Sequence, residues 1–259
     1  VLVSTDDPSQ HSSRTEQDNR WLGRLNNVPV LEPSNPQEAK ELVKYALELS
    51  ENVKLPVILR TVTRLSHMRS DVALGEIQKL GREPEFDWEG FSYRVAGFEK
   101  LFRRHKERKE KIDRVQEEFE DLPFNSLKLS GDESIGVIGV GFAFTYLKDA
   151  IDAMGLENDV AWLKLASSYP MPEKLVTRLI ESVDTVLVAE EVDPFVELHI
   201  KALAKDTNPD LVINGRMDGT LPREGELSHK IVDNVLADLF GLEKSLEKRL
   251  DLEKEKNDL

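Results

Sequence analysis

The sequence predicts an α/β protein in which an incomplete parallel sheet is followed by a helical linker and a three-layer α/β domain. Three observations indicate this class. Short apolar runs alternate with helical patterns in residues 1–75 and again in residues 131–241. Charged side chains are concentrated in residues 76–130, which we interpret as a linker arm with a helix, and in residues 242–259, which we interpret as a charged helical tail.

The pattern of the first part of the sequence, residues 1–75, predicts a strand, a loop, a helix, a strand, a helix and a strand in this order. Val1-Leu2-Val3 is typical of the end of a buried strand, Val28–Leu31 of a brief one, and residues 56–61 of a third that is buried. Gln37–Glu51 has the apolar spacing of a one-sided helix, with Pro36 suited to its first position. Because part of a parallel sheet cannot cover both of its faces, we expect the rest on a preceding segment or another chain.

A polar loop, residues 6–20, follows the first strand and lacks any large apolar side chain. Open α/β sheets bind ligands outside the carboxyl ends of their strands, so the loop is a candidate site. Alternatively, Ser12 and Ser13 could cap a helix over Arg14–Leu25, with Glu16 completing a capping box. Capping does not explain four further polar residues, which are His11, Gln17, Asp18 and Asn19.

The segment 60–67 follows the third strand and should meet the polar loop at the same edge of the sheet. Two polar segments that meet in this way favour a site, although Arg60 and Arg64 could simply pair with the acidic loop. The linker contains a charged helix, Lys100–Asp121, and aromatic residues that we interpret as an extended arm lying on a neighbouring surface: Phe86, Trp88, Phe91, Tyr93 and Phe98. The basic half of the helix gives way to an acidic half, which favours a solvated helix over a nucleic-acid site.

The last large part alternates four short strands with helices, which is typical of a mainly parallel sheet covered on both faces. The expected strands are Ser134–Val140, Ala161–Ala166, Thr185–Ala189 and Leu211–Ile213. The expected helices are Phe142–Met154, Glu173–Ser182, Pro194–Ala204 and one from about Ser228.

Charge and composition exclude several classes of function. The net charge of −14 argues against nucleic acid or an anionic membrane as the main partner. The sequence contains no apolar run of about eighteen residues and no basic-then-apolar leader, so we expect a soluble cytoplasmic protein. It also contains no cysteine, so it can hold neither a disulfide nor a thiolate-bound zinc or iron–sulfur site.

Four motifs resemble known cofactor, metal or catalytic sites, but in each case we assign no such site. Gly139-Val140-Gly141 lacks the third glycine of a dinucleotide fingerprint, and we interpret it as a tight turn. Gly131-Asp132 precedes a strand, whereas a magnesium-binding aspartate would follow one. The five histidines share no metal-ligand spacing, so we assign no metal site. Glu190-Glu191 is a carboxylate pair at a strand end that we expect to meet basic groups or water, without a catalytic role.

Ordered blocks of the sequence resemble the alpha subunits of indolepyruvate ferredoxin oxidoreductase, in the thiamine-diphosphate-dependent 2-oxoacid:ferredoxin oxidoreductase family. The resemblance spans nearly the whole chain and is loose in Glu76–Leu129. Its blocks are the polar loop, Pro29–Ser34, Gln37–Lys40, Pro56–Arg64, Val188–Glu191 with Pro194-Phe195, and Gly215–Pro222. The resemblance implies that residues 1–75 are the later portion of a pyrimidine-binding domain and residues 131–241 a transketolase C-terminal-like domain.

The resemblance also implies oxidative decarboxylation of an aryl 2-oxoacid such as indolepyruvate to an acyl-CoA, with electrons passed to ferredoxin. The complete enzyme would contain thiamine diphosphate with Mg²⁺ and [4Fe-4S] clusters, and this chain alone would hold none of them. We expect missing segments or companion chains to carry the diphosphate-binding and ferredoxin-like domains, and a second subunit, ferredoxin, coenzyme A and the 2-oxoacid to be partners. A competing interpretation is a non-catalytic assembly module that retains the fold.

Within the complete enzyme, the expected site residues come from the two polar segments. His11 would be the catalytic polar contact to substrate or cofactor, because a neutral imidazole can relay a proton near physiological pH. Arg60 would be a possible carboxylate clamp. The orienting residues would be Ser12, Ser13, Glu16, Gln17 and Asn19.

Overall fold

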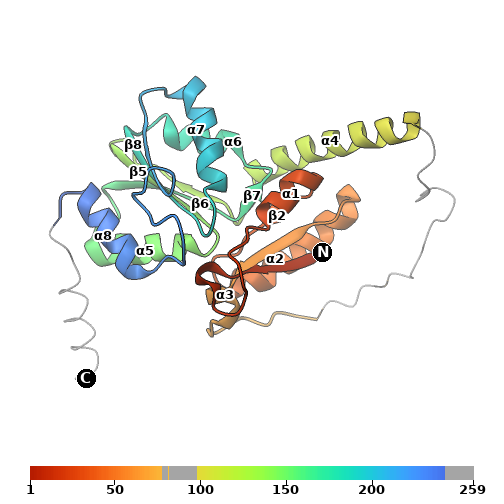
Figure 1. Ribbon diagram of the computed structural model, residues 1–259, viewed down its shortest axis with the longest axis horizontal. Helices are drawn as coiled ribbons and strands as arrows, with labels where there is room; N and C mark the ends of the chain where they lie inside the picture. The colour runs from red at the N-terminus through yellow and green to blue at the C-terminus, as the bar shows by residue number, and fades with distance from the viewer. Residues whose placement is uncertain (78–80, 82–97, 243–259) are drawn as a thin grey trace.

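The computed structural model describes residues 1–77, 81 and 98–242, which form two β-sheets with helices packed on them (Figure 1). The expected aromatic arm, apart from Phe98, and nearly all of the expected tail lie outside the described residues. Within the described residues, no helix combines the length and apolar character that crossing a membrane requires.

The first sheet has four strands, and one of them comes from the distant second half of the chain. In spatial order they are β1 (Leu2–Asp6), β3 (Ile58–Val62), β2 (Val30–Leu31) and β7 (Ser167–Tyr169). The three strands of the first part are parallel, as predicted, whereas β7 pairs with β2 in the antiparallel direction. Strand β7 was not predicted from the sequence. Its pairing joins the two parts of the chain through backbone hydrogen bonds.

The helices of the first part connect its strands. They are α1 (Arg20–Asn26), α2 (Pro36–Val53) and the short α3 (Thr63–His67), with a 3₁₀ turn η1 (Pro8–Gln10) after β1. Helix α2 begins with Pro36 at the first helical position, as expected, and Asn35 caps it by accepting a hydrogen bond from the backbone N–H of Glu38.

Strand β1 lies at the edge of the first sheet, and its apolar residues are not buried as the sequence analysis expected. The side chains of Leu2 and Val3 are 55% and 60% exposed. The reason is the strand order, because β1 has β3 on one side and no further strand among the described residues on the other.

The second sheet is the expected mainly parallel one, with one added strand. In spatial order it contains β4 (Ser126–Lys128), β6 (Val160–Leu165), β5 (Ile135–Val140), β8 (Thr185–Ala189) and β9 (Val212–Asn214). All neighbours are parallel except β4, which the sequence analysis did not anticipate and which runs antiparallel to β6.

Helices cover both faces of the second sheet, as expected for three layers (Figure 1). On one face, α5 (Ala143–Met154) and α8 (His229–Leu239) form an apolar core with Val137 and Leu187. On the other face, α6 (Glu173–Ile180) and α7 (Phe195–Thr207) pack on Ile138 and Val188.

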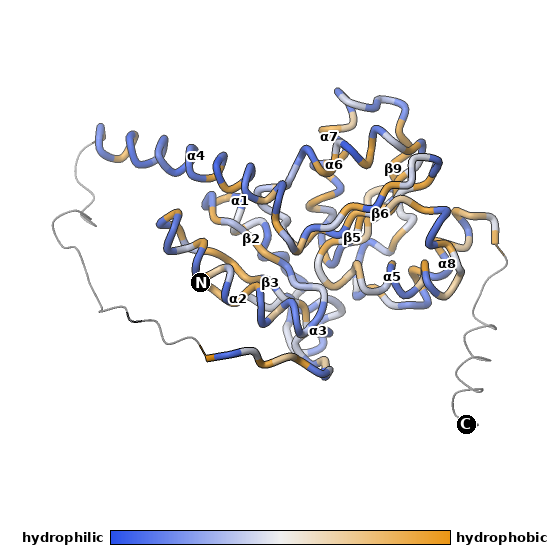
Figure 2. Tube along the Cα trace, turned by 180° about the vertical axis from the view of Figure 1, so that it is seen from behind, coloured by the Kyte–Doolittle hydropathy of each residue, from blue (hydrophilic) through white to orange (hydrophobic). Residues whose placement is uncertain are grey.

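Helix α4 (Phe98–Glu120) is solvated along its first half only. This half is hydrophilic and projects from the rest of the molecule (Figure 2), and Phe102 is 73% exposed. One face of the second half is buried, since Val115 and Phe119 pack with Leu42 of α2 in a third apolar core. The prediction of a solvated linker helix is therefore wrong for this face, which is part of that core.

Replacing Phe119 with alanine should lower the free energy of unfolding by about 3–5 kcal/mol, because it leaves a cavity in a packed core. Phe102→Ala, on the exposed half of the same helix, should change it by less than about 0.5 kcal/mol. Denaturant unfolding of the complete protein measures both values. Equal effects of the two substitutions would contradict the assignment of the second half of α4 to the core.

Candidate functional site

The polar loop is organised by the carboxylate of Asp7, not by a helix cap. Asp7 accepts hydrogen bonds from the backbone N–H groups of Ser12 and Ser13, both at 2.7 Å, and from the hydroxyl of Thr63 at 2.7 Å. These hydrogen bonds hold the pKa of Asp7 well below its usual range. Since the serine amides are satisfied by Asp7, no helix begins there, and the predicted helix over residues 14–25 is wrong in its first six residues.

The predicted capping box is also wrong, because the carboxylate of Glu16 binds elsewhere. It accepts hydrogen bonds from the backbone N–H of Ser9 at 2.5 Å and of Gly225 at 3.0 Å. Ser9 and its neighbour Gln10 have φ angles of 66° and 54°, a left-handed conformation that is uncommon for residues other than glycine. Glu16 therefore ties a strained turn of the polar loop to a segment 209 residues further along the chain.

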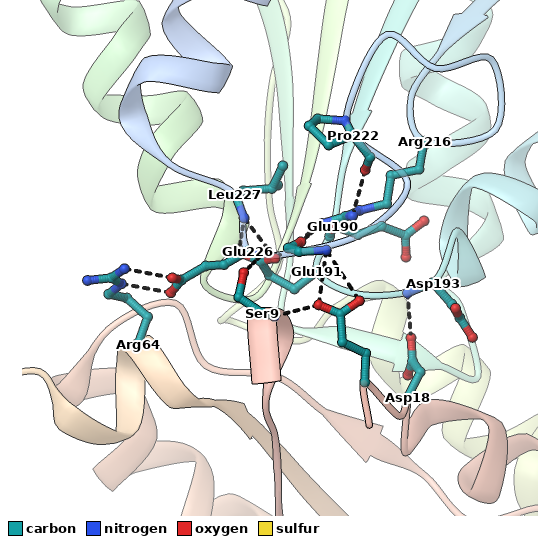
Figure 3. A network of polar contacts seen from close by, with 12 residues as sticks. Ser9, Asp18, Arg64, Glu190, Glu191, Asp193, Arg216, Pro222, Glu226 and Leu227 are labelled. Carbon is teal, nitrogen blue, oxygen red and sulfur yellow. Dashed lines mark hydrogen bonds and ion pairs between the residues drawn. The ribbon is translucent and has the colours of Figure 1, made fainter. Parts of the chain in front are cut away.

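That distant segment, which we call the 215–227 loop, connects β9 to α8. Its first turn is held by the buried carboxylate of Glu197, which accepts the backbone N–H groups of Arg216 at 2.8 Å and Met217 at 3.1 Å. Its far end is held by Ser9, whose hydroxyl accepts the backbone N–H of Glu226 at 2.8 Å, and by Glu191, which accepts that of Leu227 at 3.2 Å (Figure 3). The loop therefore bridges the second sheet and the polar loop.

Beneath these loops, three buried arginines converge on Glu190 and Glu191 at the end of β8. Arg20 binds the Glu190 carboxylate at 2.5 Å and donates to the carbonyl of Glu191 at 2.8 Å. Arg60 donates to the same carbonyl at 3.0 Å. Arg216 donates to the carbonyl of Glu190 at 2.8 Å and binds the Glu191 carboxylate at 3.2 Å. The expectation that this carboxylate pair meets basic groups is confirmed.

Further carboxylates complete what we call the buried ionic network. Arg20 also binds Asp18, and Arg60 binds Asp6 and Glu32. The network consists of Asp6, Asp18, Arg20, Glu32, Arg60, Glu190, Glu191 and Arg216. Its five carboxylates outnumber its three arginines, and burial raises the pKa of Glu190 and that of Glu191, the latter to about 7.

Two of the predicted site residues take part in this buried region. All three guanidinium nitrogens of Arg60 contact the protein, and its side chain is 1% exposed. This geometry does not favour the clamp role expected of Arg60. Asn19 donates its backbone N–H and its side-chain amide to Asp6. Gln17 is exposed.

An open pocket of about 510 Å³ lies where the polar loop meets α3. The expected meeting of two polar segments is thus confirmed. The pocket is lined by His11, Ser12, Thr63, Arg64, His67, Met68 and Glu226. His11 Nε2 lies 3.2 Å from Glu226 Oε2, and Arg64 donates to both oxygens of Glu226 at 2.7 and 2.6 Å (Figure 3). These hydrogen bonds raise the pKa of Arg64. The pocket therefore presents cationic and imidazole groups around a single carboxylate.

Two residues of the site were not predicted from the sequence: Glu226, and Arg216 as a member of the buried ionic network. Both lie in a glycine-rich segment after a strand, which indicates a loop at the same edge of the sheet. The contacts of Glu226 with residues 9, 11 and 64 are long-range, so no local pattern indicates them. The interpretation of Gly139-Val140-Gly141 as a tight turn is confirmed. A Cβ on Gly139 would lie 2.6 Å from Phe144 Cα, and Gly141, at φ +52°, donates its N–H to Leu165.

No protein-family model matches the chain. Among curated proteins, it is 39% identical over 247 residues to the indolepyruvate oxidoreductase subunit IorA of Pyrococcus abyssi and 41% identical over 254 residues to that of Methanothermobacter marburgensis. The two alignments cover 94% and 97% of this chain but 38% and 40% of the relatives. The chain thus spans about two fifths of the length of these relatives.

Two solved structures share the fold. A 2-oxoglutarate:ferredoxin oxidoreductase from Magnetococcus marinus, with 2-oxoglutarate, coenzyme A and succinyl-CoA bound, superposes with a TM-score of 0.54 at 13% identity, covering 81% of this chain and 42% of that chain. A split-gene transketolase, an inactive beta4 tetramer, superposes with a TM-score of 0.51 at 12% identity, covering 93% of this chain and 66% of that chain. The predicted α/β fold class is therefore confirmed.

The raised pKa of Glu191 predicts a specific pH dependence of stability. Between pH 4.5 and about 7 the folded protein retains a proton on Glu191 that the unfolded chain releases. The unfolded state then binds fewer protons, so the free energy of unfolding should fall as the pH rises through this window. Glu191→Gln should remove this component of the slope.

Denaturant unfolding at several pH values, compared between the wild-type protein and Glu191→Gln, isolates the contribution of this residue. Glu224→Gln, on the exposed part of the same loop, is the matched control and should keep the wild-type slope. If the free energy of unfolding depended on pH in the same way in the wild-type protein and in Glu191→Gln, the assignment of this pH dependence to Glu191 would be contradicted.

Proposed function

We propose that this chain, which corresponds to one segment of the indolepyruvate oxidoreductase subunit IorA family, forms one wall of an active site for 2-oxoacids. The complete enzyme would oxidatively decarboxylate an aryl 2-oxoacid such as indolepyruvate, transfer the acyl group to coenzyme A and pass electrons to ferredoxin. The observation that carries this proposal is the pocket itself, where three segments of the chain bring imidazole, hydroxyl and guanidinium groups together.

The pocket chemistry suits a small acidic substrate. A 2-oxoacid carries a carboxylate beside a keto oxygen, and both accept hydrogen bonds. The imidazole of His11 can donate to such an oxygen, and the charge of Arg64 complements the carboxylate, while the hydroxyls of Ser12 and Thr63 are already bound to Asp7. Because Asp7 fixes the backbone of the loop and Thr63 together, these groups are held in place before a substrate arrives.

The residues of this chain do not fit the metal–diphosphate portion of thiamine diphosphate. Magnesium on a diphosphate is usually held by one or two free carboxylates together with phosphate oxygens and water. The buried carboxylates are instead bound by arginines. Thiamine diphosphate supplies carbanion stabilisation when bound, and we assign its metal and diphosphate contacts to other parts of the enzyme.

We further assign residues 1–75 to the later portion of a pyrimidine-binding domain and residues 131–241 to a transketolase C-terminal-like domain. The absence of cysteine from all 259 residues means that [4Fe-4S] clusters must be ligated elsewhere. Partner segments or chains would therefore supply the diphosphate-binding domain and the ferredoxin-like domain, and a second subunit would complete the enzyme.

His11 is the residue of this chain that we assign to contact the reacting substrate or the cofactor. Its ring is about half exposed at the pocket, with a side-chain exposure of 48%, and is held by Glu226. Ser12 and Ser13 would shape the loop through their amides, since both donate to Asp7. Glu16, Gln17 and Asn19 would have positioning roles, with Glu16 fixing the strained turn and Asn19 binding Asp6.

In the complete enzyme, His11→Ala should lower kcat/KM for the 2-oxoacid by roughly 10- to 100-fold, because it removes a hydrogen bond to a charged or reacting group. The assay is ferredoxin reduction that depends on both indolepyruvate and coenzyme A. His105→Ala, on the exposed half of α4, is the matched control and should retain full activity.

Two results would count against the proposal. A complete enzyme that reduces no ferredoxin with any aryl 2-oxoacid would contradict the proposed reaction. Full activity of the His11→Ala enzyme would contradict only the role given to this histidine.

A further inference from the structure

The contact between Arg64 and Glu226 differs from every arginine contact in the buried ionic network. Arg64 forms a two-pronged pair with Glu226, but its side chain is 54% exposed at the pocket, whereas Arg20, Arg60 and Arg216 are at most 1% exposed. The Glu226 side chain is only 9% exposed, so the pair is open to the pocket from the side of Arg64. A second carboxylate in the pocket could therefore reach Arg64 and compete with Glu226 for it.

The position of Glu226 does not depend on this ion pair. Its backbone N–H is held by the Ser9 hydroxyl at 2.8 Å. The residues on either side are also fixed, because Gly225 donates to Glu16 at 3.0 Å and Leu227 donates to the buried Glu191 at 3.2 Å. The backbone of the 215–227 loop would therefore stay in place if the Glu226 side chain left Arg64.

The donors around the Glu226 carboxylate form a ready carboxylate-binding arrangement. Two guanidinium nitrogens of Arg64 contact its two oxygens, and His11 Nε2 lies 3.2 Å from one of them. The planar fork of an arginine matches a carboxylate in this geometry. Ser12 and Thr63 line the same pocket, where their hydroxyl groups are fixed by Asp7.

From this arrangement we propose that Arg64 binds the carboxylate of the 2-oxoacid, and that Glu226 occupies the same position as an internal carboxylate which the substrate displaces. This inference rests on the proposed function and deepens it by naming the substrate-binding residue. In this proposal Arg64, and not Arg60, is the cation that binds the substrate, which agrees with the contacts of all three guanidinium nitrogens of Arg60 in the buried ionic network.

Glu226→Gln tests the displacement directly, because it removes the competing charge and keeps the size of the side chain. In the complete enzyme this substitution should lower the KM for indolepyruvate by about two- to fivefold, with little change in kcat. It should lower by the same factor the inhibition constant of 3-phenylpropionate, a carboxylate without a keto group. Glu224→Gln removes a charge from an exposed position of the same loop and should leave both constants unchanged.

Substitutions of Arg64 test the other half of the inference. Arg64→Gln should raise the KM and the inhibition constant of 3-phenylpropionate by about tenfold or more, since a hydrogen-bonded charge is lost. Arg64→Lys should recover part of this loss, because it keeps the charge without the fork. Arg69→Gln, at an exposed position five residues further on, should behave as the wild-type enzyme.

The outcomes separate this inference from the proposed function. An unchanged or raised KM in Glu226→Gln would overturn the displacement by showing that Glu226 only positions Arg64 and His11. A wild-type KM in Arg64→Gln would overturn the carboxylate-binding role while leaving the proposed reaction intact. A wild-type enzyme without activity toward any aryl 2-oxoacid would instead overturn the proposed function itself.

Discussion

The convergence of three buried arginines on the end of β8 is the constraint on which the rest of this structure depends. Arg20 and Arg60 come from the first part of the chain, and both donate to the carbonyl of Glu191 in the second part. Charges buried in a protein interior are tolerated only when paired, so any arrangement of the two parts that kept these charges buried without their partners would be strongly disfavoured. The network therefore holds the two parts in one arrangement, which the pairing of β2 with β7 also supports.

This constraint determines which polar groups remain available at the surface. Above the network, the polar loop and the 215–227 loop are joined by Glu16 and Ser9. The residues that reach the pocket are those the network does not use, chiefly His11 and Arg64. Two arginines of one segment thus have different surroundings: Arg60 points into the network, and Arg64, in the first turn of α3, faces the pocket.

Local patterns predicted much of the fold, whereas long-range contacts could not be predicted. The start of α2 at Pro36 and the start of α8 near Ser228 follow from residues adjacent in sequence, and both are observed. The helix expected from residue 14 failed because Asp7, outside the motif, accepts the serine amides. Strand β7 and the contact between Arg64 and Glu226 join residues more than 130 positions apart, which no local pattern encodes.

The central claim is that a 2-oxoacid binds where the two loops and α3 meet. Hydrogen–deuterium exchange of the complete enzyme, with and without 3-phenylpropionate, tests it most directly. We expect the exchange rates of residues 8–16, 63–68 and 223–228 to change together, while residues 98–108 of α4 keep their rates. Ligand binding that leaves these three segments unchanged would contradict binding at this pocket.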